Sequence, residues 1–446
     1  MILNYWKYHK FPILFAIAAI FLYGSFAYDL LRTDFTKLIT LYGALFFLFY
    51  KLVQFEKGNF KLLLVLAILF RLVFLFTIPN LSQDFYRFIW DGRMILEGWT
   101  PYLYTPESLI ASGTAPIDQA KELYEGMGWL SAGNHTNYPP LHQLGFIIAG
   151  IFAGKSIVGS VVVMRIVIIA AELGTLYFGK KLLERLNLPV HYIFFYTLNP
   201  FIIIELTGNL HFEAVMIFFL VWGLYLLHIE KWRYAALVMA LSVSVKLIPL
   251  LFLPLVFQKL GWKKSIIFYT IIGIVNFLLF LPFLSPQFIQ NYTETTALWF
   301  TNFEFNGSFY YLIRELGYHI KGYNIIRVFG KITPYILLAF VLAMAFLRKS
   351  KSTSQLITAM LFSLFFYYAI ATVVHPWYIA TLVILSLFTK YRFPLVWSFV
   401  IILSYIAYGN ADYKENYPLL FIAYGMVYGY FLYEVIKYRP NSAQPF

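Results

Sequence analysis

Apolar runs of about 20 residues recur along the whole chain, and this repetition constrains the fold more than any single motif. A helical run of that length matches the hydrocarbon core of a bilayer. Of the 446 residues, 61% are hydrophobic and only 12% are charged, so there is too little polar surface to cover a soluble body. We therefore expect an all-α polytopic membrane protein, residues 1–446 forming one integrated domain, built as a transmembrane bundle of about 13–14 helices.

The net charge of +13 and the absence of cysteine limit the binding partners and the catalytic chemistry that are expected for this chain. In a membrane protein an excess of Lys and Arg collects in short cytoplasmic loops, so it does not indicate a nucleic-acid partner. Without cysteine, disulfides, thiol catalysis and cysteine metal sites are excluded.

Charges at the ends of the apolar runs predict the topology. The first three crossings are expected at 11–31, 38–54 and 61–80, and Lys7 and Lys10 precede them, so the N-terminus is expected in the cytoplasm. The loop 81–135 is then external and long enough to carry interfacial helices such as 106–127. Later crossings are expected near 265–284, 325–347, 353–373, 377–389, 393–408 and 417–437, with a second external loop at 285–323 and a cytoplasmic C-terminus.

For two segments, 139–154 and 234–258, the sequence allows either one crossing of the membrane or none. If each crosses once, five cations lie outside, against the charge rule. These cations are Lys180, Lys181, Arg185, Lys231 and Arg233. They lie inside if 139–154 dips in and returns, and if 234–258 is a hairpin of two short helices broken near Lys246 and Pro249. The second arrangement is preferred, and it puts Lys246 on the external side.

The polar segment 82–104 follows the third apolar run and carries two aspartates. Ser82 is expected to cap a helix on which Asp84, Arg87 and Asp91 share one face. A pair between Arg87 and Asp91 would leave Asp84 unpaired at the mouth of the bundle, where partial desolvation tunes a general base. The structural alternative is that Asp84 complements the helix dipole and Asp91 forms a surface ion pair. No carboxylate cluster indicates a metal site.

Ionisable residues within apolar runs are costly in hydrocarbon and are therefore functional candidates. Lys246, in SVSVKLIPLLFLPL, places an ammonium group where it suits a phosphate, with snorkelling to the interface as the alternative. His375 begins HPWY and is a candidate to hydrogen-bond a leaving phosphate or relay a proton, or else an interfacial histidine with structural bonds.

Five further polar residues are candidates for either a functional or a structural role. Arg165 is a candidate phosphate-binding cation, whereas Glu172, on the same predicted helix, is expected to be structural. Arg71 is expected near the membrane middle, bonded to backbone or to a partner acid. Asn209 and His211, in TGNLHFE, are candidates either for substrate contact or for capping a helix junction.

Four motifs occur in order along the chain: DFYRFIWDGRMILEGWTPY at 84–102, NYPPL at 137–141, KLIP at 246–249 and HPWY at 375–378. In this order and topology the chain resembles the polyprenyl-phosphate-sugar-dependent glycosyltransferases of the GT-C superfamily. It is most similar in pattern to the glycolipid mannosyltransferases.

The resemblance implies a GT-C-like helix bundle with large external loops that carry interfacial helices and an active site on the non-cytoplasmic face. Asp84 matches the general base of the family's first large loop. Gln83 stands beside it where many relatives have a second acid, so Asp91 is the second candidate catalytic acid. Donor phosphate contacts are assigned to Lys246, His375 and Arg165. Substrate contacts are assigned to Arg87, Tyr138, Asn209, His211, Trp377 and Tyr378.

The function implied is inverting transfer of a sugar, with mannose favoured, from a polyprenyl-phosphate sugar to a hydroxyl of a lipid-linked or glycan acceptor. The location implied is the bacterial plasma membrane, with membrane lipids as further partners. Cationic side chains are expected to replace a divalent ion, so no cofactor and no obligatory metal are predicted. Two alternatives are a flippase or transporter of polyprenyl-linked lipids, and a GT-C enzyme that uses glucose, arabinose or aminoarabinose.

Overall fold

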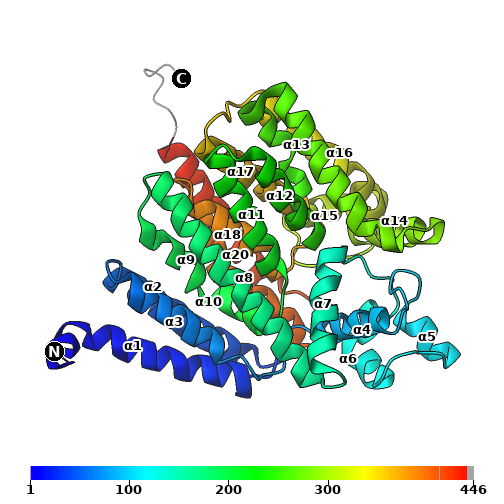
Figure 1. Cartoon of the computed structure of the whole chain (residues 1–446), viewed down its shortest axis with the longest axis horizontal. Helices are drawn as coiled ribbons and strands as arrows, with labels where there is room; N and C mark the ends of the chain where they lie inside the picture. The colour runs from blue at the N-terminus through cyan, green and yellow to red at the C-terminus, as the bar shows by residue number, and fades with distance from the viewer. Residues whose placement is uncertain (1, 411, 439–446) are drawn as a thin grey trace.

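Helices make up the regular structure of the computed structural model, which describes residues 2–410 and 412–438 (Figure 1). None of these residues forms a strand, and Phe305 and Val373 make an isolated bridge. The α-helices are α1 (Ile2–Asp29), α2 (Phe35–Phe55), α3 (Phe60–Leu72), α4 (Asp84–Leu96), α5 (Pro106–Ser112), α6 (Ala120–Ala132), α7 (Pro140–Ala153), α8 (Ile157–Arg185), α9 (Phe194–Thr197), α10 (Pro200–Ile202), α11 (Glu213–His228), α12 (Trp232–Val245), α13 (Phe257–Phe280), α14 (Pro286–Thr301), α15 (Phe309–Lys321), α16 (Ile326–Phe346), α17 (Thr353–Ile370), α18 (Ile379–Leu387), α19 (Phe393–Val400) and α20 (Tyr417–Lys437). The 3₁₀ segments are η1 (Val190–Ile193), η3 (Ile248–Phe252), η4 (Pro254–Val256), η5 (Leu281–Phe283), η6 (Pro376–Tyr378) and η7 (Ile401–Gly409), and η2 (Ile203–Gly208) is a π-helical segment.

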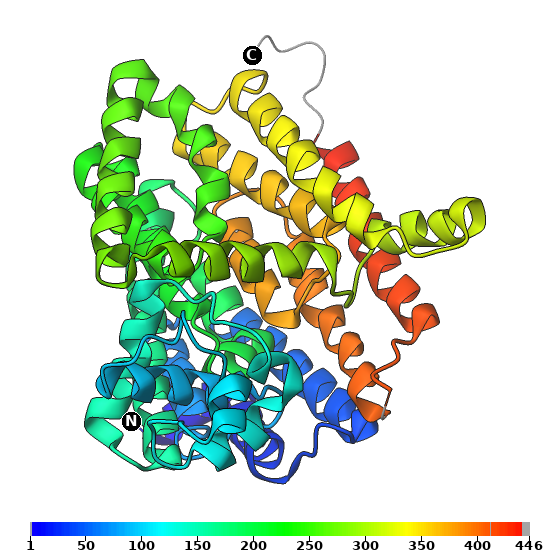
Figure 2. The ribbon, with the colours of Figure 1, turned by 90° about the vertical axis from the view of Figure 1, so that its right-hand side faces the viewer.

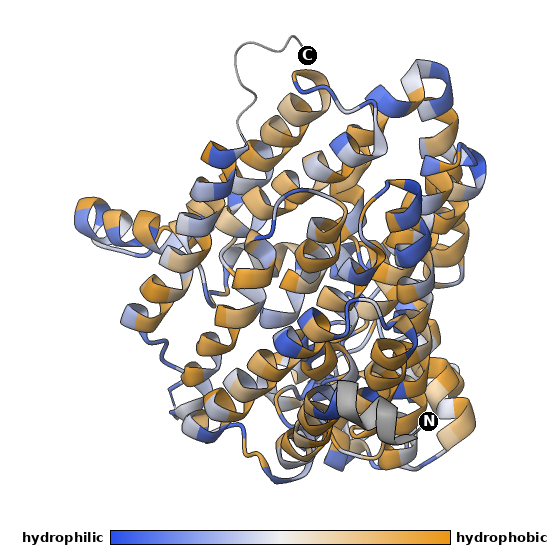
Figure 3. Ribbon diagram, turned by 90° about the vertical axis from the view of Figure 1, so that its left-hand side faces the viewer, coloured by the Kyte–Doolittle hydropathy of each residue, from blue (hydrophilic) through white to orange (hydrophobic). Residues whose placement is uncertain are grey.

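Seven helical segments of the described chain are long and apolar enough to cross a membrane, or eight if a bent pair is taken as one span. The seven are His9–Asp29, Phe35–Phe55, Ile157–Arg185, Ile248–Phe283, Ile326–Phe346, Thr353–Ile370 and Tyr417–Lys437. Five shorter apolar helices lie among them. Hydrophobic residues predominate along the helices, and hydrophilic residues lie mostly at helix ends and in loops (Figure 3). The predicted all-α polytopic membrane protein is confirmed.

The first three helices lie together at the N-terminal side of the molecule (Figure 1). Two of them begin at side-chain caps: Asp34 accepts a hydrogen bond from the backbone N–H of Lys37, and Asn59 does the same for Leu62. Each cap satisfies one of the N–H groups that a helix start leaves without an intrahelical partner. The α1–α2 and α2–α3 loops lie at opposite ends of α2 (Figure 1).

Helix α3 is shorter than the crossing predicted at 61–80, because it ends at Leu72 and the chain continues in turns. Two carbonyls of these turns, those of Leu75 and Thr77, accept hydrogen bonds from Arg165. Pro79 follows and cannot continue a helix. The irregular segment is therefore stabilised from within the protein, which is what non-helical backbone at membrane depth requires.

The segment 139–154 has no turn of its own, so the expected dip and return does not take place within these residues, and at 14 residues its helix is too short to count among the candidate spans. It forms one unbroken helix, α7, which runs from Pro140 to Ala153. Its glycines allow close packing rather than a bend, because a Cβ at Gly145 would overlap the ring of Phe212. Gly154, with φ 54°, then begins the turn into α8.

The predicted break near Lys246 and Pro249 is confirmed. Helix α12 ends at Val245, and Lys246 is extended, with φ −149° and ψ 145°. The second short helix of the expected hairpin is replaced by the 3₁₀ segments η3 and η4, which lead into α13. Pro249 and Pro254 lie in these segments and remove backbone donors that a regular α-helix would need.

A bent helical pair, residues 190–197 and 200–208, lies between α8 and α11 and turns by 47° at its break. Beside the break, Arg71 Nε and Nη2 donate to both carboxylate oxygens of Glu172 at 2.8 and 2.9 Å. Arg71 Nη1 also donates to the carbonyl of Thr197. The prediction that Arg71 and Glu172 are structural is confirmed, because their ion pair is buried and holds the bent pair.

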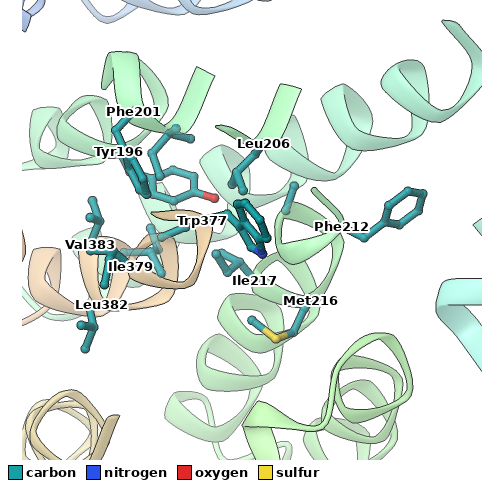
Figure 4. Packing of buried hydrophobic residues seen from close by; sticks show 14 of the residues in the cluster. Tyr196, Phe201, Leu206, Phe212, Met216, Ile217, Trp377, Ile379, Leu382 and Val383 are labelled. Atoms are coloured by element: carbon teal, nitrogen blue, oxygen red, sulfur yellow. The ribbon is translucent and has the colours of Figure 1, made fainter. Parts of the chain in front are cut away.

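The bundle interior joins elements that are distant in sequence. Trp377 of η6 lies among side chains from the bent pair and α11, including Leu206 and Ile217 (Figure 4). Every residue of α18 is buried, so this short helix contacts protein on all sides.

The segments 81–135 and 285–323 carry the helices outside the main bundle. The first contains α4, α5 and α6, so the helix predicted at 106–127 is two helices, separated where Gly113 adopts φ 68°. The second contains α14 and α15. Helix α14 lies across the bundle next to the cyan α4–α6 segment (Figure 2).

Candidate active site

A cavity of about 970 Å³ opens where α4, the break after α12, and η6 approach one another. Of the eleven residues that the sequence assigned to catalysis or to phosphate and substrate contact, six line it: Asp84, Tyr138, Lys246, His375, Trp377 and Tyr378. Five others lie behind its wall: Arg87, Asp91, Arg165, Asn209 and His211. The four sequence motifs therefore meet in one chamber, although 291 positions separate Asp84 from His375.

Asp84 is the first residue of α4, so its carboxylate lies at the positive end of a helix dipole. The Ser82 hydroxyl accepts a hydrogen bond from the Asp84 backbone N–H at 3.3 Å, although the N-cap position itself is Gln83. About a third of the Asp84 side chain, 36%, remains accessible from the cavity. The carboxylate is thus fixed at a helix start and still open to a ligand.

The electrostatic surroundings of Asp84 make it a proton acceptor near neutral pH. Burial raises its pKa to about 6, against the lowering effects of Lys246 and Arg32 and with a further contribution from Glu213. A general base works best when its pKa lies near the operating pH. Asp84 meets that requirement.

Lys246 forms an ion pair with Glu213, the first residue of α11. Its ammonium nitrogen also lies 5.6 Å from the centre of the Tyr378 ring. Glu213 is nearly fully buried, whereas Lys246 is partly open to the cavity. In the sequence, Glu213 ends the TGNLHFE motif, whose polar residues were open between substrate contact and capping of a helix junction. Its pairing with Lys246 was not predicted, because a pairing across 33 positions has no local signal.

Arg32, which sequence analysis did not single out, also lines the cavity. It lies in the loop between α1 and α2, with its guanidinium carbon 4.2 Å from the centre of the Tyr408 ring. Its Nη1 is 3.5 Å from the carbonyl oxygen of Leu81. In the sequence it resembles any cation that flanks a membrane segment, so no signal distinguished it.

The imidazoles of His375 and His211 both stack on Trp377. Their ring centres lie 4.5 and 3.8 Å from that of Trp377, with interplanar angles of 4° and 23°. His211 is buried, and its Nδ1 donates to the carbonyl of Glu205 at 2.8 Å. Its Nε2 lies 3.9 Å from Asp84 Oδ2, which is too long for a hydrogen bond.

Both histidines are neutral at pH 7. Burial, together with the nearby Lys246 charge, lowers the pKa of His375 to about 3 and holds that of His211 well below its ordinary value. His375 is therefore a neutral hydrogen-bonding group on the cavity wall rather than a cation.

Arg87 and Asp91 form the predicted pair, with 2.7 Å between Arg87 Nε and Asp91 Oδ1. Both are buried, so the alternative of a surface ion pair is wrong. Asp91 also accepts from Gln143 Nε2 at 3.1 Å. Arg87 Nη1 donates to the backbone carbonyls of Ser131 and Asn134, which ties α4 to the end of α6. This geometry keeps Asp91 away from the cavity.

Arg165 and Asn209 likewise bind the protein itself. The Arg165 guanidinium donates to four backbone carbonyls, those of Leu75, Thr77, Thr207 and Gly208. Asn209 Oδ1 accepts from the backbone N–H of Leu81 at 3.2 Å. Both side chains therefore hold the bent pair against the chain that leads into α4.

One arm of the cavity is apolar. It is lined by side chains that follow the break, Leu247, Ile248, Leu250, Leu251 and Pro254, and by side chains of α16, Pro334, Leu337, Leu338 and Val341. Leu250 and Leu338 are also exposed, so this arm reaches the apolar outer surface of the bundle. Among the residues that the structure describes, no group of three or more His, Asp or Glu side chains is placed to hold a metal ion.

Comparison with known families decides the class of this protein. The profile of the MptA_B family, described as alpha-(1->6)-mannopyranosyltransferase, N-terminal domain, matches residues 32–260, slightly more than half of the chain. The chain belongs to this GT-C mannosyltransferase family. No curated protein matches it.

The matched region of the mannosyltransferase contains Asp84, Lys246 and Arg32. His375, Trp377 and Tyr378 lie beyond it, and the cavity brings them to the same site. The predictions of a GT-C mannosyltransferase and of an integral membrane protein are confirmed.

Proposed function

We propose that this mannosyltransferase moves mannose from a polyprenyl-phosphate-mannose donor to a hydroxyl of a lipid-linked or glycan acceptor, with inversion, on the non-cytoplasmic face. One observation supports the proposal above all others: a single cavity combines a carboxylate with a raised pKa, two cations and an apolar arm. The donor has three matching parts, a reacting sugar, an anionic phosphate and a hydrocarbon tail.

The reaction proposed is one displacement. The acceptor oxygen attacks the anomeric carbon, the bond from that carbon to the phosphate oxygen breaks, and the polyprenyl phosphate leaves with the bonding electrons. Asp84 accepts the proton of the acceptor hydroxyl. Because the nucleophile enters opposite the leaving group, the anomeric configuration inverts. An alpha product, as the family description prints, then requires a beta-linked donor.

Lys246 and Arg32 are proposed to stabilise the charge of the departing phosphate. Both line the cavity, and both act on the carboxyl group of Asp84, as their effects on its pKa indicate. His375 adds a neutral hydrogen bond. Arg165, which the sequence assigned to the phosphate, is instead proposed to position the bent pair, since four carbonyls already occupy its guanidinium.

Of the other predicted site residues, some line the cavity and some hold the residues that line it. Tyr138, Trp377 and Tyr378 line the cavity and are proposed to contact the substrates. Asp91 is proposed to act as a positioning residue rather than a second base, because it is fully buried against Arg87. Asn209 and His211 are also proposed as supports. His211 would keep Trp377 in place, and Asn209 would fix the approach to α4.

The apolar arm is proposed to hold the polyprenyl chain. It begins directly after Lys246 and ends at the exposed apolar surface of α16. A lipid in the bilayer can therefore enter sideways and bring its phosphate to Lys246 while its tail remains among apolar side chains.

Cations at the other end of the bundle support the proposed orientation. Lys180, near the end of α8, lies 4.8 Å from the ring centre of Phe60 at the start of α3. Arg392, just before α19, lies 4.8 Å from the ring of Tyr192. The chain runs from the start of α3 toward Asp84, so these cations lie away from the cavity. The positive-inside rule then puts them in the cytoplasm.

The termini follow from the same reasoning. Helix α1 ends next to Arg32, which lines the cavity, so the start of α1 lies at the opposite, cation-rich end of the bundle. The end of α20 also lies at the cation-rich end, because Tyr438 there contacts Tyr391, the neighbour of Arg392. We therefore propose that both termini are cytoplasmic and that the protein lies in the bacterial plasma membrane.

The experiment that tests the proposal uses the full chain in liposomes with synthetic, mannose-labelled polyprenyl phosphates of beta and of alpha configuration. We expect label to pass from the beta donor alone to an acceptor hydroxyl and to form an alpha linkage. Use of the alpha donor would contradict inversion, and use of a nucleotide-linked mannose would contradict the lipid donor. Movement of intact donor across the membrane without cleavage would favour the flippase, and preference for an arabinosyl or glucosyl donor would favour the other GT-C enzymes.

A further inference from the structure

A buried ring nitrogen faces Asp84 without a hydrogen-bond partner. Only 2% of the His211 side chain is exposed, and none of the described residues forms a hydrogen bond with its Nε2. This nitrogen lies 3.9 Å from Asp84 Oδ2. Most buried polar atoms in a folded protein have a partner, because an unpaired one loses the hydrogen bond that water would supply. The position of Nε2 beside the proposed base therefore requires a physical explanation.

The hydrogen bond at the other ring nitrogen decides which form of His211 is present. The backbone carbonyl of Glu205 can only accept a hydrogen bond, so the hydrogen of the neutral ring is on Nδ1, which lies 2.8 Å from this carbonyl oxygen. Nε2 then has a lone pair and no hydrogen, and it acts as an acceptor. An ionised carboxylate also contains acceptors only, so ionised Asp84 cannot bond to Nε2. Protonated Asp84 can, because it has an O–H group.

The backbone that leads to His211 has an unusual conformation. Residues Ile203–Gly208 form a π-helical segment, and the fully buried Leu210 adopts a left-handed conformation with φ 62°. Bulky residues rarely adopt this conformation, and both features are frequent at functional sites. The backbone N–H of His211 donates to the Leu206 carbonyl across this turn. The strained turn therefore lies directly before the ring that faces the base.

The ring of His211 is also held on its face and on its Nδ1 side. One face stacks on Trp377, with 3.8 Å between the ring centres. On the Nδ1 side, Glu205 Oε2 lies 3.6 Å away, and this carboxyl group accepts hydrogen bonds from the Tyr405 hydroxyl at 2.8 Å and from Asn209 Nδ2 at 3.4 Å. These contacts hold the ring in place, so Nε2 stays on the side of the base.

We propose that His211 is a positioning residue for the transfer reaction: its Nε2 accepts a hydrogen bond from Asp84 once Asp84 has taken the proton of the acceptor hydroxyl. This hydrogen bond stabilises the protonated carboxyl group and so makes Asp84 a stronger base. The unpaired nitrogen gains its partner at the stage of the reaction in which the proton moves. This inference rests on the proposed function, and it adds a second role to the support that His211 gives to Trp377.

The proposed step accounts for every proton. The acceptor oxygen forms the new bond to the anomeric carbon and keeps the electron pair of its O–H bond, while the proton passes to Asp84 Oδ2. The O–H group so formed donates to His211 Nε2 after an approach of about 1 Å. His211 retains its hydrogen on Nδ1 throughout. When the products leave, Asp84 releases the proton to water in the cavity.

Other charged and titratable groups surround the two residues, and the test leaves them in place except where His375 is changed as a control. The groups that face Asp84 are Lys246, Glu213, Arg32 and the hydroxyls of Tyr138, Tyr378 and Tyr408, and those that face His211 are Lys246, Glu205, His375 and His142. A change in the pH profile of a His211 variant therefore reports the loss of its own contact with Asp84.

The main test compares His211→Asn with His375→Asn. Asparagine at position 211 keeps an N–H donor near the position of Nδ1 and has no atom at that of Nε2. We expect kcat to fall by about 3- to 10-fold and the acidic limb of kcat/KM to move to lower pH by about 0.5–1 pH unit, because loss of a bond to the protonated form lowers the pKa of Asp84. The KM for the donor should not change.

His375→Asn is the matched control. It removes the other imidazole that stacks on Trp377, so it reproduces the loss of stacking without touching the contact with Asp84. It should leave the acidic limb in place, whatever its effect on the KM for the donor. His211→Phe, which keeps a ring beside Trp377 and has no nitrogen, should repeat the result of His211→Asn.

A double-mutant cycle separates the proposed role from structural support. In a D84N background, His211→Asn should change kcat by less than about twofold, because no carboxyl group remains to be protonated. If His211 acted only through Trp377, its replacement would lower kcat by the same factor with or without Asp84.

A spectroscopic titration does not depend on turnover. In the full chain labelled with ¹⁵N-histidine, the Nε2 resonance of His211 is identified by its absence from the spectra of His211→Asn and His211→Phe. It should shift with a midpoint near pH 6, where Asp84 takes up its proton, and it should not shift in D84N.

Three results would overturn the proposal: an acidic limb that stays in place in both His211 variants, equal losses of kcat in the two backgrounds, or an Nε2 resonance that does not follow the titration of Asp84. If the wild-type chain transfers no mannose, the proposed function fails, while the resonance still decides whether His211 contacts Asp84.

Discussion

Replacing Asp84 by asparagine (D84N) keeps the shape of the side chain and removes its ability to accept a proton. The side chain is fixed at the start of α4 and is open to the cavity over about a third of its surface, 36%. Loss of a positioned general base lowers a rate by about 10²- to 10⁴-fold, or roughly 3–5 kcal/mol of transition-state stabilisation. We expect kcat to fall by that amount, with the KM for the donor changed little.

The pH profile of the wild-type enzyme tests the same assignment. Burial raises the pKa of Asp84 to about 6, so kcat/KM should rise as the pH increases through about 6 and then level off. Lys246 lowers this pKa and Glu213 raises it. Lys246→Met should therefore move the acidic limb to higher pH, and Glu213→Gln should move it to lower pH.

Stability gives a control against misfolding. Because the pKa of Asp84 in the folded protein lies above its ordinary value of 3.8, the folded state gains stability from the protonated carboxyl below about pH 4 and loses it as the pH rises through about 6. D84N has no carboxyl to ionise, so at pH 7.5 it should be at least as stable as the wild type in thermal unfolding.

The assay follows labelled mannose from a polyprenyl-phosphate donor to a glycan acceptor between pH 5 and 8, at saturating and subsaturating donor. A D84N enzyme with more than a tenth of the wild-type kcat would refute the base assignment. A flat wild-type profile over this pH range would refute the role given to its ionisation.

Three further predictions concern the phosphate, the interior and the metal. Lys246→Met and Arg32→Gln each remove one charge from the proposed phosphate site, so each should raise the KM for the donor by about 10- to 150-fold. Lys180→Met, at the cation-rich end of the bundle, is the control and should leave this KM unchanged. Equal donor KM values in all three variants would contradict the proposed phosphate site. Arg71→Met leaves Glu172 buried without its partner and should lower the free energy of unfolding by about 3–5 kcal/mol in denaturant titrations. A decrease of less than about 1 kcal/mol would show that the ion pair is not needed for stability. Because side chains are proposed to supply the positive charge at the phosphate, EDTA should leave the initial rate within about twofold of its starting value. A loss of rate that Mg²⁺ restores would contradict this assignment.

The sequence predicted the cavity residues that stand next to a break or a helix end. Asp84 follows the end of an apolar run, and Lys246 and His375 adjoin prolines that interrupt helices, Pro249 and Pro376. Interruptions in a membrane helix expose backbone groups, so they mark places where a cavity is tolerated. Such positions can be recognised locally.

Polar residues inside unbroken helices were harder to assign. Arg165 and Asp91 looked like functional charges, yet each is buried against partners that only the fold supplies, four carbonyls for Arg165 and the Arg87 guanidinium for Asp91. Arg32 was missed for the converse reason, because its loop position is typical of a cation that flanks a membrane segment. Only the packing of α2 beside η7 places it against Tyr408 on the cavity.

Composition and apolar periodicity determined that this chain is an all-helical membrane protein, because the length of an apolar run and its scarcity of charge are properties of the sequence itself. The order of the motifs indicated the class of enzyme. The partners of each charge were decided only by the tertiary structure. Whether a buried ion meets a carboxylate, a carbonyl or an open cavity depends on segments tens to hundreds of residues away, and their approach is set by helix packing across the whole bundle.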